Sequence, residues 1–141
     1  MRKFKSILCM VIISMLLIML MGACQTKKKN IDRVKDLEFT VVPDENVPQE
    51  LMQIIETKKE APFKLKFTST DNEYLYIVVG YGAQNTGGYS ISVDDLYLAT
   101  NAIYIDTNLI GPKKDEEVST ALTYPYVVIK TPFMDESVVF Q

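Results

Sequence analysis

Hydrophobic and polar positions divide the chain into an apolar beginning and a longer part built of short periodic segments. Basic residues at positions 2, 3 and 5 precede an apolar run over 7–21 that only Ser14 interrupts. A positive start, an apolar run and a small-residue end together are typical of a secretory signal. We therefore expect residues 1–23 to be a signal peptide.

The predicted end of this signal is the small pair Gly22-Ala23, which stands directly before Cys24. The segment from Leu20 to Cys24 resembles a bacterial lipobox, which implies cleavage before Cys24 and a diacylglyceryl group on its sulfur. Two acyl chains hold a protein at a membrane durably. We expect membrane lipid to be bound through acylated Cys24, on the extracytoplasmic face of the bacterial cell membrane, with residues 24–35 as a polar tether. An uncleaved membrane helix and plain secretion are the alternatives.

The rest of the chain, residues 36–141, is predicted to be a single β-rich domain with one amphipathic helix near its N-terminal side. Leu51, Ile54 and Ile55 recur at spacings of three and four, which predicts a helix with one apolar face. The helix is expected to end before Pro62, because proline interrupts helical hydrogen bonding.

Further segments show the alternation, or the continuous apolar run, that is typical of strands. They are 37–42, 62–68, 73–81, 89–98 with a bulge at 94–95, 103–107, 126–130 and 138–140. The run over 73–81 is apolar almost throughout, which predicts a central strand covered on both faces. Turn signals about every ten residues favour an antiparallel roll or sandwich. The expected fold class is α+β, predominantly antiparallel β.

The segment 80–91 is a candidate for function, because its four glycines fall within nine residues. Glycine permits close backbone approach, and exposed loops often contact partners. A second candidate is 124–126, where tyrosines suit an interface. The alternative for the glycine segment is a purely structural turn. The alternative for 124–126 is that its rings only cover the end of the sheet. The predicted partner-binding residues are Gly82, Asn85, Thr86, Gly87, Gly88, Tyr89, Tyr124, Pro125 and Tyr126.

Composition removes several classes of chemistry. The chain has no His, and beyond residue 23 its only Cys is Cys24. Ser-His and Cys-His nucleophile pairs and imidazole metal sites are therefore excluded. Adjacent carboxylates such as Asp94 and Asp95 point to opposite faces of a strand, which is unsuitable for acid/base work on one bond. We expect no enzyme, no catalytic residue, no metal and no cofactor, with a small hydrolase as a remote alternative.

Net charge bears on the choice of partner. The formal charge of the whole chain is −3, and the predicted signal carries basic residues but no acidic one, so the remaining part is more acidic still. An acidic domain is a poor match for nucleic acid, whose binding depends on neutralising phosphates. We therefore expect a protein partner and no nucleic acid.

Three segments carry a resemblance to a family. Leu75–Gly80, Thr86–Ile91 and Ala121–Tyr126 resemble the C-terminal domain of the protease-complex-associated PrcB family. Asn85 departs from the usual proline, and Gly111-Pro112 reverses the familiar order. The resemblance implies a bacterial, lipid-anchored accessory protein whose relative assists a surface protease complex. The expected function is therefore a non-catalytic accessory subunit that stabilises or positions a surface or secreted protease.

A second resemblance suggests a different mechanism. The turn from Asn85 to Tyr89 is similar to a binding loop of chagasin-type cysteine protease inhibitors, which wedge loops of an immunoglobulin-like sandwich into the enzyme cleft. The companion loop of that family is missing unless Tyr124–Tyr126 substitutes for it. Direct protease inhibition is thus the alternative function.

Overall fold

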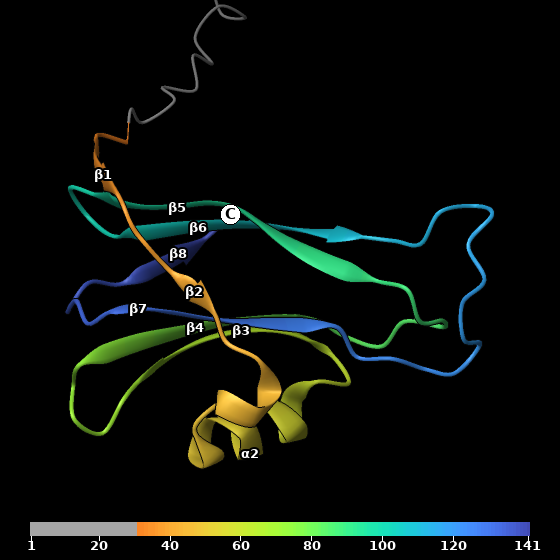
Figure 1. The fold of residues 1–141 in the computed structure, drawn as a ribbon. Helices are drawn as coiled ribbons and strands as arrows, with labels where there is room; N and C mark the ends of the chain where they lie inside the picture. Colours follow the sequence, from red (N-terminus) through yellow and green to blue (C-terminus); the bar gives the residue numbers. More distant parts are fainter. Residues whose placement is uncertain (1–30) are drawn as a thin grey trace, which may run out of the picture. The chain divides into compact units, whose positions relative to one another are not determined.

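The computed structural model describes residues 31–141, which form two four-stranded sheets packed face to face, with one α-helix (Figure 1). Sheet A has the order β1-β5-β6-β8, with bounds Arg33–Asp36, Ser90–Ala99, Ile103–Ile110 and Val138–Phe140. Sheet B has the order β2-β7-β4-β3, with bounds Thr40–Val41, Tyr126–Pro132, Tyr74–Tyr81 and Pro62–Thr68. All pairs are antiparallel except β6 with β8, so the predicted α+β, mainly antiparallel class is confirmed, and the architecture is a sandwich.

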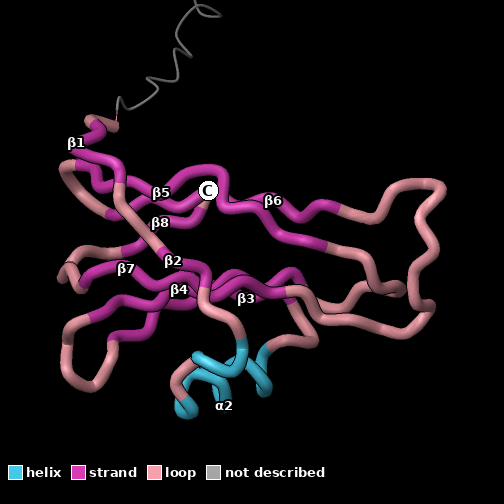
Figure 2. Tube along the Cα trace, viewed as in Figure 1, coloured by secondary structure: helices cyan, strands magenta, loops and turns pink. Residues whose placement is uncertain are grey.

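The helix α2, Gln49–Lys58, lies on the outer face of sheet B, preceded by a short 3-10 turn, η1, at Asp44–Asn46 (Figure 2). Leu51 and Ile55 are fully buried against sheet B, whereas Ile54 is only half-buried. The helix begins directly after Pro48, which lacks the N–H that a first turn would leave unpaired. The predicted helix and most of its apolar face are therefore confirmed.

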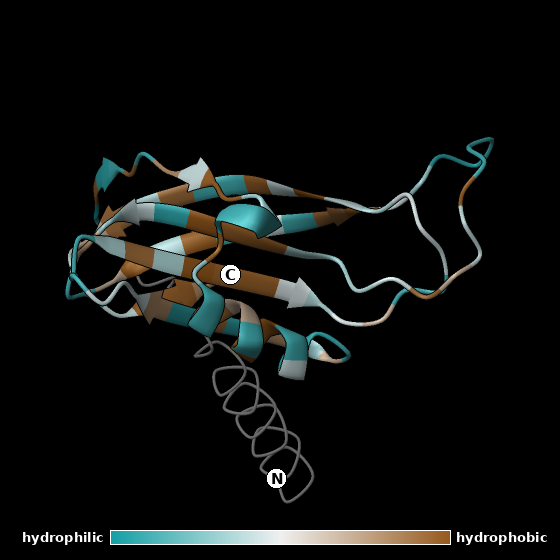
Figure 3. Cartoon of the chain, turned by 60° about the horizontal axis from the view of Figure 1, so that its bottom comes forward, coloured by the Kyte–Doolittle hydropathy of each residue, from teal (hydrophilic) through white to brown (hydrophobic). Residues whose placement is uncertain are grey.

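Strand β4 separates two apolar layers. Leu75, Ile77 and Val79 point between the sheets, where they pack with residues of β5, β6 and β7. Tyr76 and Val78 point the other way, toward α2. Because successive side chains of a strand alternate between faces, a strand covered on both sides is apolar throughout. Figure 3 shows these apolar stretches along the central strands, with hydrophilic residues at the tip of the protruding loop.

The first predicted strand, 37–42, is wrong. The chain instead forms β1 on sheet A and β2 on sheet B, joined by Leu37–Phe39, which crosses between the sheets. The side chain of Arg33 anchors β1 through two hydrogen bonds to the carboxylate of Asp95, at 2.8 and 2.9 Å. The hydroxyl of Thr131 donates to the carbonyl of Glu38 at 2.9 Å and holds the crossing segment. These contacts hold the crossing segment in place, and the local alternation of polar and apolar residues does not indicate them.

The same strand corrects the predicted end of the tether. Residues 33–35 belong to β1, so the domain begins before the expected boundary at residue 36. The predicted signal 1–23 and the lipid-attachment residue Cys24 lie outside the described residues. Within 31–141, no helix has the length and apolar character needed to cross a membrane.

Candidate functional site

Two long loops meet at one end of the sandwich. The β4–β5 loop, residues 82–89, carries the chain from sheet B to sheet A, and the β6–β7 loop, residues 111–125, carries it back. Both crossings occur at the same end, on the right in Figure 1. Because both loops bridge the same two sheets, segments that are distant in sequence come to lie side by side.

Hydrogen bonds join these loops into one unit. Gln84 and Thr123 form an isolated antiparallel bridge, with N···O distances of 2.8 and 3.0 Å. The N–H of Gly87 donates to the carbonyl of Ser119 at 2.8 Å, and the hydroxyl of Thr123 donates to the carbonyl of Thr86 at 2.7 Å. These bonds pair several backbone groups of one loop with groups of the other, which fixes the relative position of the loops without a regular sheet.

A shallow hollow of about 180 Å³ opens between the joined loops. It is lined by Gly87, Gly88, Tyr89, Thr123, Tyr124 and Pro125. The lining offers backbone groups, a hydroxyl and phenol rings, with no carboxylate and no amine. The volume is below the range of roughly 300–1,000 Å³ typical of small-molecule pockets. The hollow therefore suits a side chain of a partner better than a free ligand.

Gly82 lies at the base of the β4–β5 loop and is buried. Its φ is +73°, and a Cβ at this position would lie 2.8 Å from Cδ and 2.9 Å from N of Pro62. The neighbouring N–H of Ala83 donates to the carbonyl of Glu60 at 3.1 Å. Of the predicted partner-binding residues, Gly82 thus shapes the loop and presents no surface to a partner.

The other predicted residues of this loop lie toward solvent. Asn85 and Gly88 are exposed, and Thr86 and Tyr89 are half-buried. The ring of Tyr89 packs over Gly111, since a Cβ on that glycine would lie 3.4 Å from the ring. Tyr89 therefore anchors the start of the β6–β7 loop and lines the hollow at the same time.

The tyrosines of the second motif have different positions. Tyr124 and Pro125 line the hollow, whereas Tyr126 lies on the helix side of sheet B. The hydroxyl of Tyr126 donates to a carboxylate oxygen of Asp44 at 2.9 Å, and its ring packs near Met52. Burial, reinforced by the Asp44 hydrogen bond, raises the pKa of Tyr126. Tyr126 thus fastens β7 to the η1 turn and lies apart from the hollow.

Sequence reasoning missed Leu122, which is 59% exposed in the β6–β7 loop next to the hollow. Ile110, at the end of β6, is also exposed at this end of the sandwich. The available signal was a leucine within a polar loop segment, close to Pro125. A single exposed leucine is common on protein surfaces, so Leu122 adds accessible apolar area beside the hollow without by itself indicating a partner.

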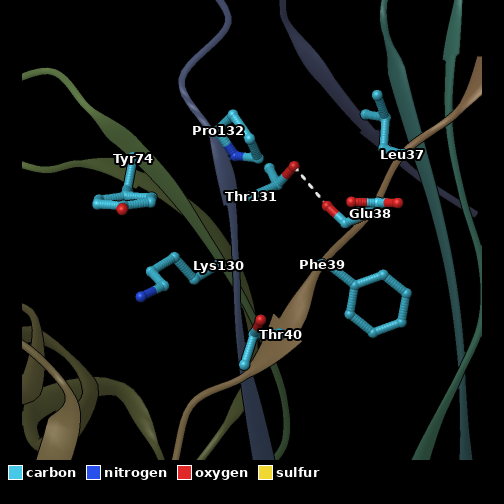
Figure 4. Close-up of a pocket in the computed structure, with 8 residues that line it drawn as sticks. All are labelled: Leu37, Glu38, Phe39, Thr40, Tyr74, Lys130, Thr131 and Pro132. Atoms are coloured by element: carbon cyan, nitrogen blue, oxygen red, sulfur yellow. Dashed lines mark hydrogen bonds between the residues drawn. The ribbon is translucent and has the colours of Figure 1, made fainter.

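The other hollows have other surroundings. One of about 540 Å³ lies beside β2 and β7, with Phe39 on one side and Tyr74 and Lys130 on the other (Figure 4). The ammonium of Lys130 is 4.5 Å from the ring centroid of Tyr74, a cation–π contact. The charged residues in its lining are Glu38 and Lys130, and the lining contains no paired nucleophile and base.

The adjacent carboxylates Asp94 and Asp95 bind different side chains. Asp95 accepts hydrogen bonds from Arg33, whereas Asp94 accepts one from the hydroxyl of Ser92 at 2.6 Å. Their carboxylates thus bind different side chains, at the point where β5 has a register irregularity. Across residues 31–141, no three His, Cys, Asp or Glu side chains gather in a way that could hold a metal ion.

Comparison with known families gives one result that covers both loops. Residues 75–132 match the family model described as PrcB C-terminal. The matched region runs from β4 to the end of β7 and so includes every residue that lines the hollow. The chain matches none of the curated proteins or solved structures with which it was compared.

Proposed function

On the basis of the match between residues 75–132 and the PrcB C-terminal family model, we propose that the chain is a non-catalytic accessory subunit of a protease complex. Lipid on Cys24 anchors it at the extracytoplasmic face of a bacterial membrane. Its partner is a protein, namely a surface or secreted protease that the domain stabilises or positions.

The observation that carries this proposal is the joining of the two loops around the hollow. The bridge between Gln84 and Thr123 and the bond from Gly87 to Ser119 hold the surface in one arrangement before any partner arrives. A surface that is already ordered loses less conformational entropy on binding. Exposed Leu122 and the half-buried rings of Tyr89 and Tyr124 supply the apolar contact area.

The joined loops lie far from the point where the described chain enters the sandwich. The N–H of Thr100, just after β5, donates to the carbonyl of Asp32 at 3.1 Å, so the entry lies at that end of β5. The joined loops lie at the other end, beyond Ser90. Ten residues of strand span about 30 Å. The joined loops therefore lie at the end of the sandwich opposite to Asp32, near the start of the described chain.

A second function, direct protease inhibition, is favoured by one specific observation. The turn Asn85–Tyr89 lies beside Tyr124 and Pro125, so two adjacent loops are available to enter a cleft. The two functions differ in outcome: inhibition lowers the turnover of the protease, whereas an accessory role keeps or prolongs it.

The test is site-specific photocrosslinking in intact bacterial cells, with a matched control. A photoreactive residue replaces Leu122 at the loop end in one strain and Val34 in β1 in another, because the two are 59% and 57% exposed. We expect crosslinks from position 122, and not from position 34, to a species that an active-site protease probe labels. Crosslinks from position 34 alone would contradict the proposed surface.

The captured protease then separates the two functions. Purified chain is added to it, and peptide turnover is followed over hours. Retained or prolonged turnover supports the accessory role, and a stoichiometric loss of turnover supports inhibition. Leu122→Glu should weaken either effect, whereas Val34→Glu, at a similarly exposed apolar position, should not.

A further inference from the structure

Strand β3 forms one edge of sheet B and pairs only with β4 among the described strands. The pairing is regular over seven residues, from Pro62 opposite Tyr81 to Thr68 opposite Leu75. Directly beyond it, the N–H of Ser69 donates to the carbonyl of Tyr74 at 2.9 Å. β3 is thus an edge strand with a regular register and no bulge.

That last bond shows which backbone groups of β3 remain free. In an antiparallel ladder, hydrogen-bonded and non-hydrogen-bonded pairs alternate. Ser69 bonds to its partner, so Phe67, Leu65 and Phe63 do as well. Lys64, Lys66 and Thr68 therefore direct their N–H and C=O groups away from β4. No other backbone hydrogen bond within residues 31–141 reaches these three residues, which we call the free edge.

The side chains beside the free edge differ on its two sides. Phe63, Leu65 and Phe67 are half-buried on the side that carries α2. The lysines point to the other side, toward β8. The ammonium of Lys64 is 5.6 Å from the ring centroid of Phe140, and that of Lys66 donates to the carbonyl of Glu136 at 3.1 Å. An added strand would thus meet an apolar side and a cationic side.

The remaining edges of the described sheets are short. β2 has two residues and β8 has three. β1 has four residues with a register irregularity, and it continues into β2 through the crossing segment. A regular edge of seven residues provides the longest run of outward backbone groups among these four.

The positive charge of Lys64 and Lys66 indicates which kind of segment can bind this edge. A second copy paired antiparallel along all seven residues of β3 would bring Lys64 opposite Lys66, and like charges directly opposite each other are destabilising. The basic run Lys27–Lys29 in the chain's own N-terminal part is unsuitable for the same reason. Acidic side chains are complementary to both lysines.

We infer that the free edge of β3 binds an extended segment of a partner protein in which acidic and apolar residues alternate. Backbone hydrogen bonds to Lys64, Lys66 and Thr68 provide affinity, and the alternating side chains provide specificity. The apolar side chains of the segment lie against Phe63, Leu65 and Phe67, and its carboxylates lie against the lysines. This surface is separate from the joined loops and does not depend on them.

The test uses the purified full chain and two seven-residue peptides, Glu-Val-Glu-Val-Glu-Val-Glu and the same peptide with lysine in place of glutamate. Amide hydrogen exchange is measured by NMR with each peptide in millimolar excess. We expect the acidic peptide to slow exchange at Lys64, Lys66 and Thr68 at least several-fold, and the basic peptide to leave it unchanged. Equal effects of both peptides, or protection confined to the joined loops, would overturn the inference.

Two variants separate backbone from charge. Thr68→Pro removes one outward N–H and keeps both lysines, at an edge position where proline is tolerated, and should weaken the protection of Lys64 and Lys66 by the acidic peptide. The double variant Lys64→Glu/Lys66→Glu keeps every backbone group and should reverse the preference toward the basic peptide. A double variant that still prefers the acidic peptide would refute the charge complementarity. Leu122→Glu, which alters the joined loops, should leave peptide binding unchanged.

Discussion

Replacing Gly82 by alanine tests how the base of the β4–β5 loop is held. Gly82 is buried with φ of +73°, and a new Cβ would lie 2.8 Å from Cδ of Pro62 and 3.1 Å from the carbonyl carbon of Ala61. The left-handed conformation costs a non-glycine residue roughly 1–2 kcal/mol. Overpacking adds about 1–3 kcal/mol. Because the two costs overlap, we expect Gly82→Ala to lower the free energy of unfolding by about 2–4 kcal/mol.

Gly87→Ala is the matched control in the same loop. Gly87 does not have a positive φ, and its Cβ would lie 3.6 Å from Cβ of Ser119, an ordinary contact. Alanine keeps the N–H that donates to Ser119. We therefore expect Gly87→Ala to change the free energy of unfolding by no more than about 0.5 kcal/mol.

Urea denaturation followed by circular dichroism measures both variants under the same conditions. A loss of about 3 kcal/mol should also lower the Tm by roughly 10 °C or more. If both alanines destabilised the protein equally, or if Gly82→Ala fell within the range expected for Gly87→Ala, the assignment of strain and close packing to Gly82 would be refuted.

Two further predictions concern the core and β7. Ile129 is fully buried between the sheets, so Ile129→Ala should cost about 2–5 kcal/mol in urea denaturation; a loss below 1 kcal/mol would contradict tight packing there. Tyr126→Phe removes the hydrogen bond to Asp44 and should cost about 0.5–1.5 kcal/mol at neutral pH. Because the folded pKa of Tyr126 is raised above its ordinary value of 10.0, its contribution is complete below about pH 10 and declines as the unfolded phenol ionises above it. The phenylalanine variant should therefore lose less stability on alkaline titration, and an equal loss would contradict that raised pKa.

Local periodicity predicted the elements whose environment repeats along the strand or helix. The alternation of Phe63, Leu65 and Phe67 with lysines predicted a strand with unlike faces, and β3 has such faces. The bulge expected at Asp94-Asp95 corresponds to the register shift between Val93 and Asp95. These features depend on neighbours close in sequence, so a pattern is sufficient to find them.

The prediction of a single strand over 37–42 failed because alternation does not say which sheet a residue joins. Arg33 is bound to Asp95, which is 62 residues away in sequence, and this contact holds β1 on sheet A. Thr131 holds Glu38 across a separation of 93 residues. Contacts of such separation leave no trace in the local pattern of polar and apolar positions.

In the candidate site, too, some features could be predicted from the sequence and others could not. Its motifs, with Gly87, Gly88 and Tyr89 in one and Tyr124 and Pro125 in the other, were identified from residue type alone. Residue type alone could not show three other features of the site. Gly82 is buried, Tyr126 packs on the helix side of sheet B, and Leu122 is exposed. Each of these depends on which surface the surrounding strands leave uncovered.

By itself, the sequence determined the α+β class, the helix, most strands and the two motifs, because each follows from backbone preferences and from side-chain spacing over a few residues. Tertiary structure alone decided that the β4–β5 and β6–β7 loops form one surface. Thr123 donates to the carbonyl of Thr86 across 37 residues, and that bond exists only because both loops cross between the sheets at the same end. The physical reason is that sheet pairing brings distant segments together, and no local pattern carries the identity of the partner strand.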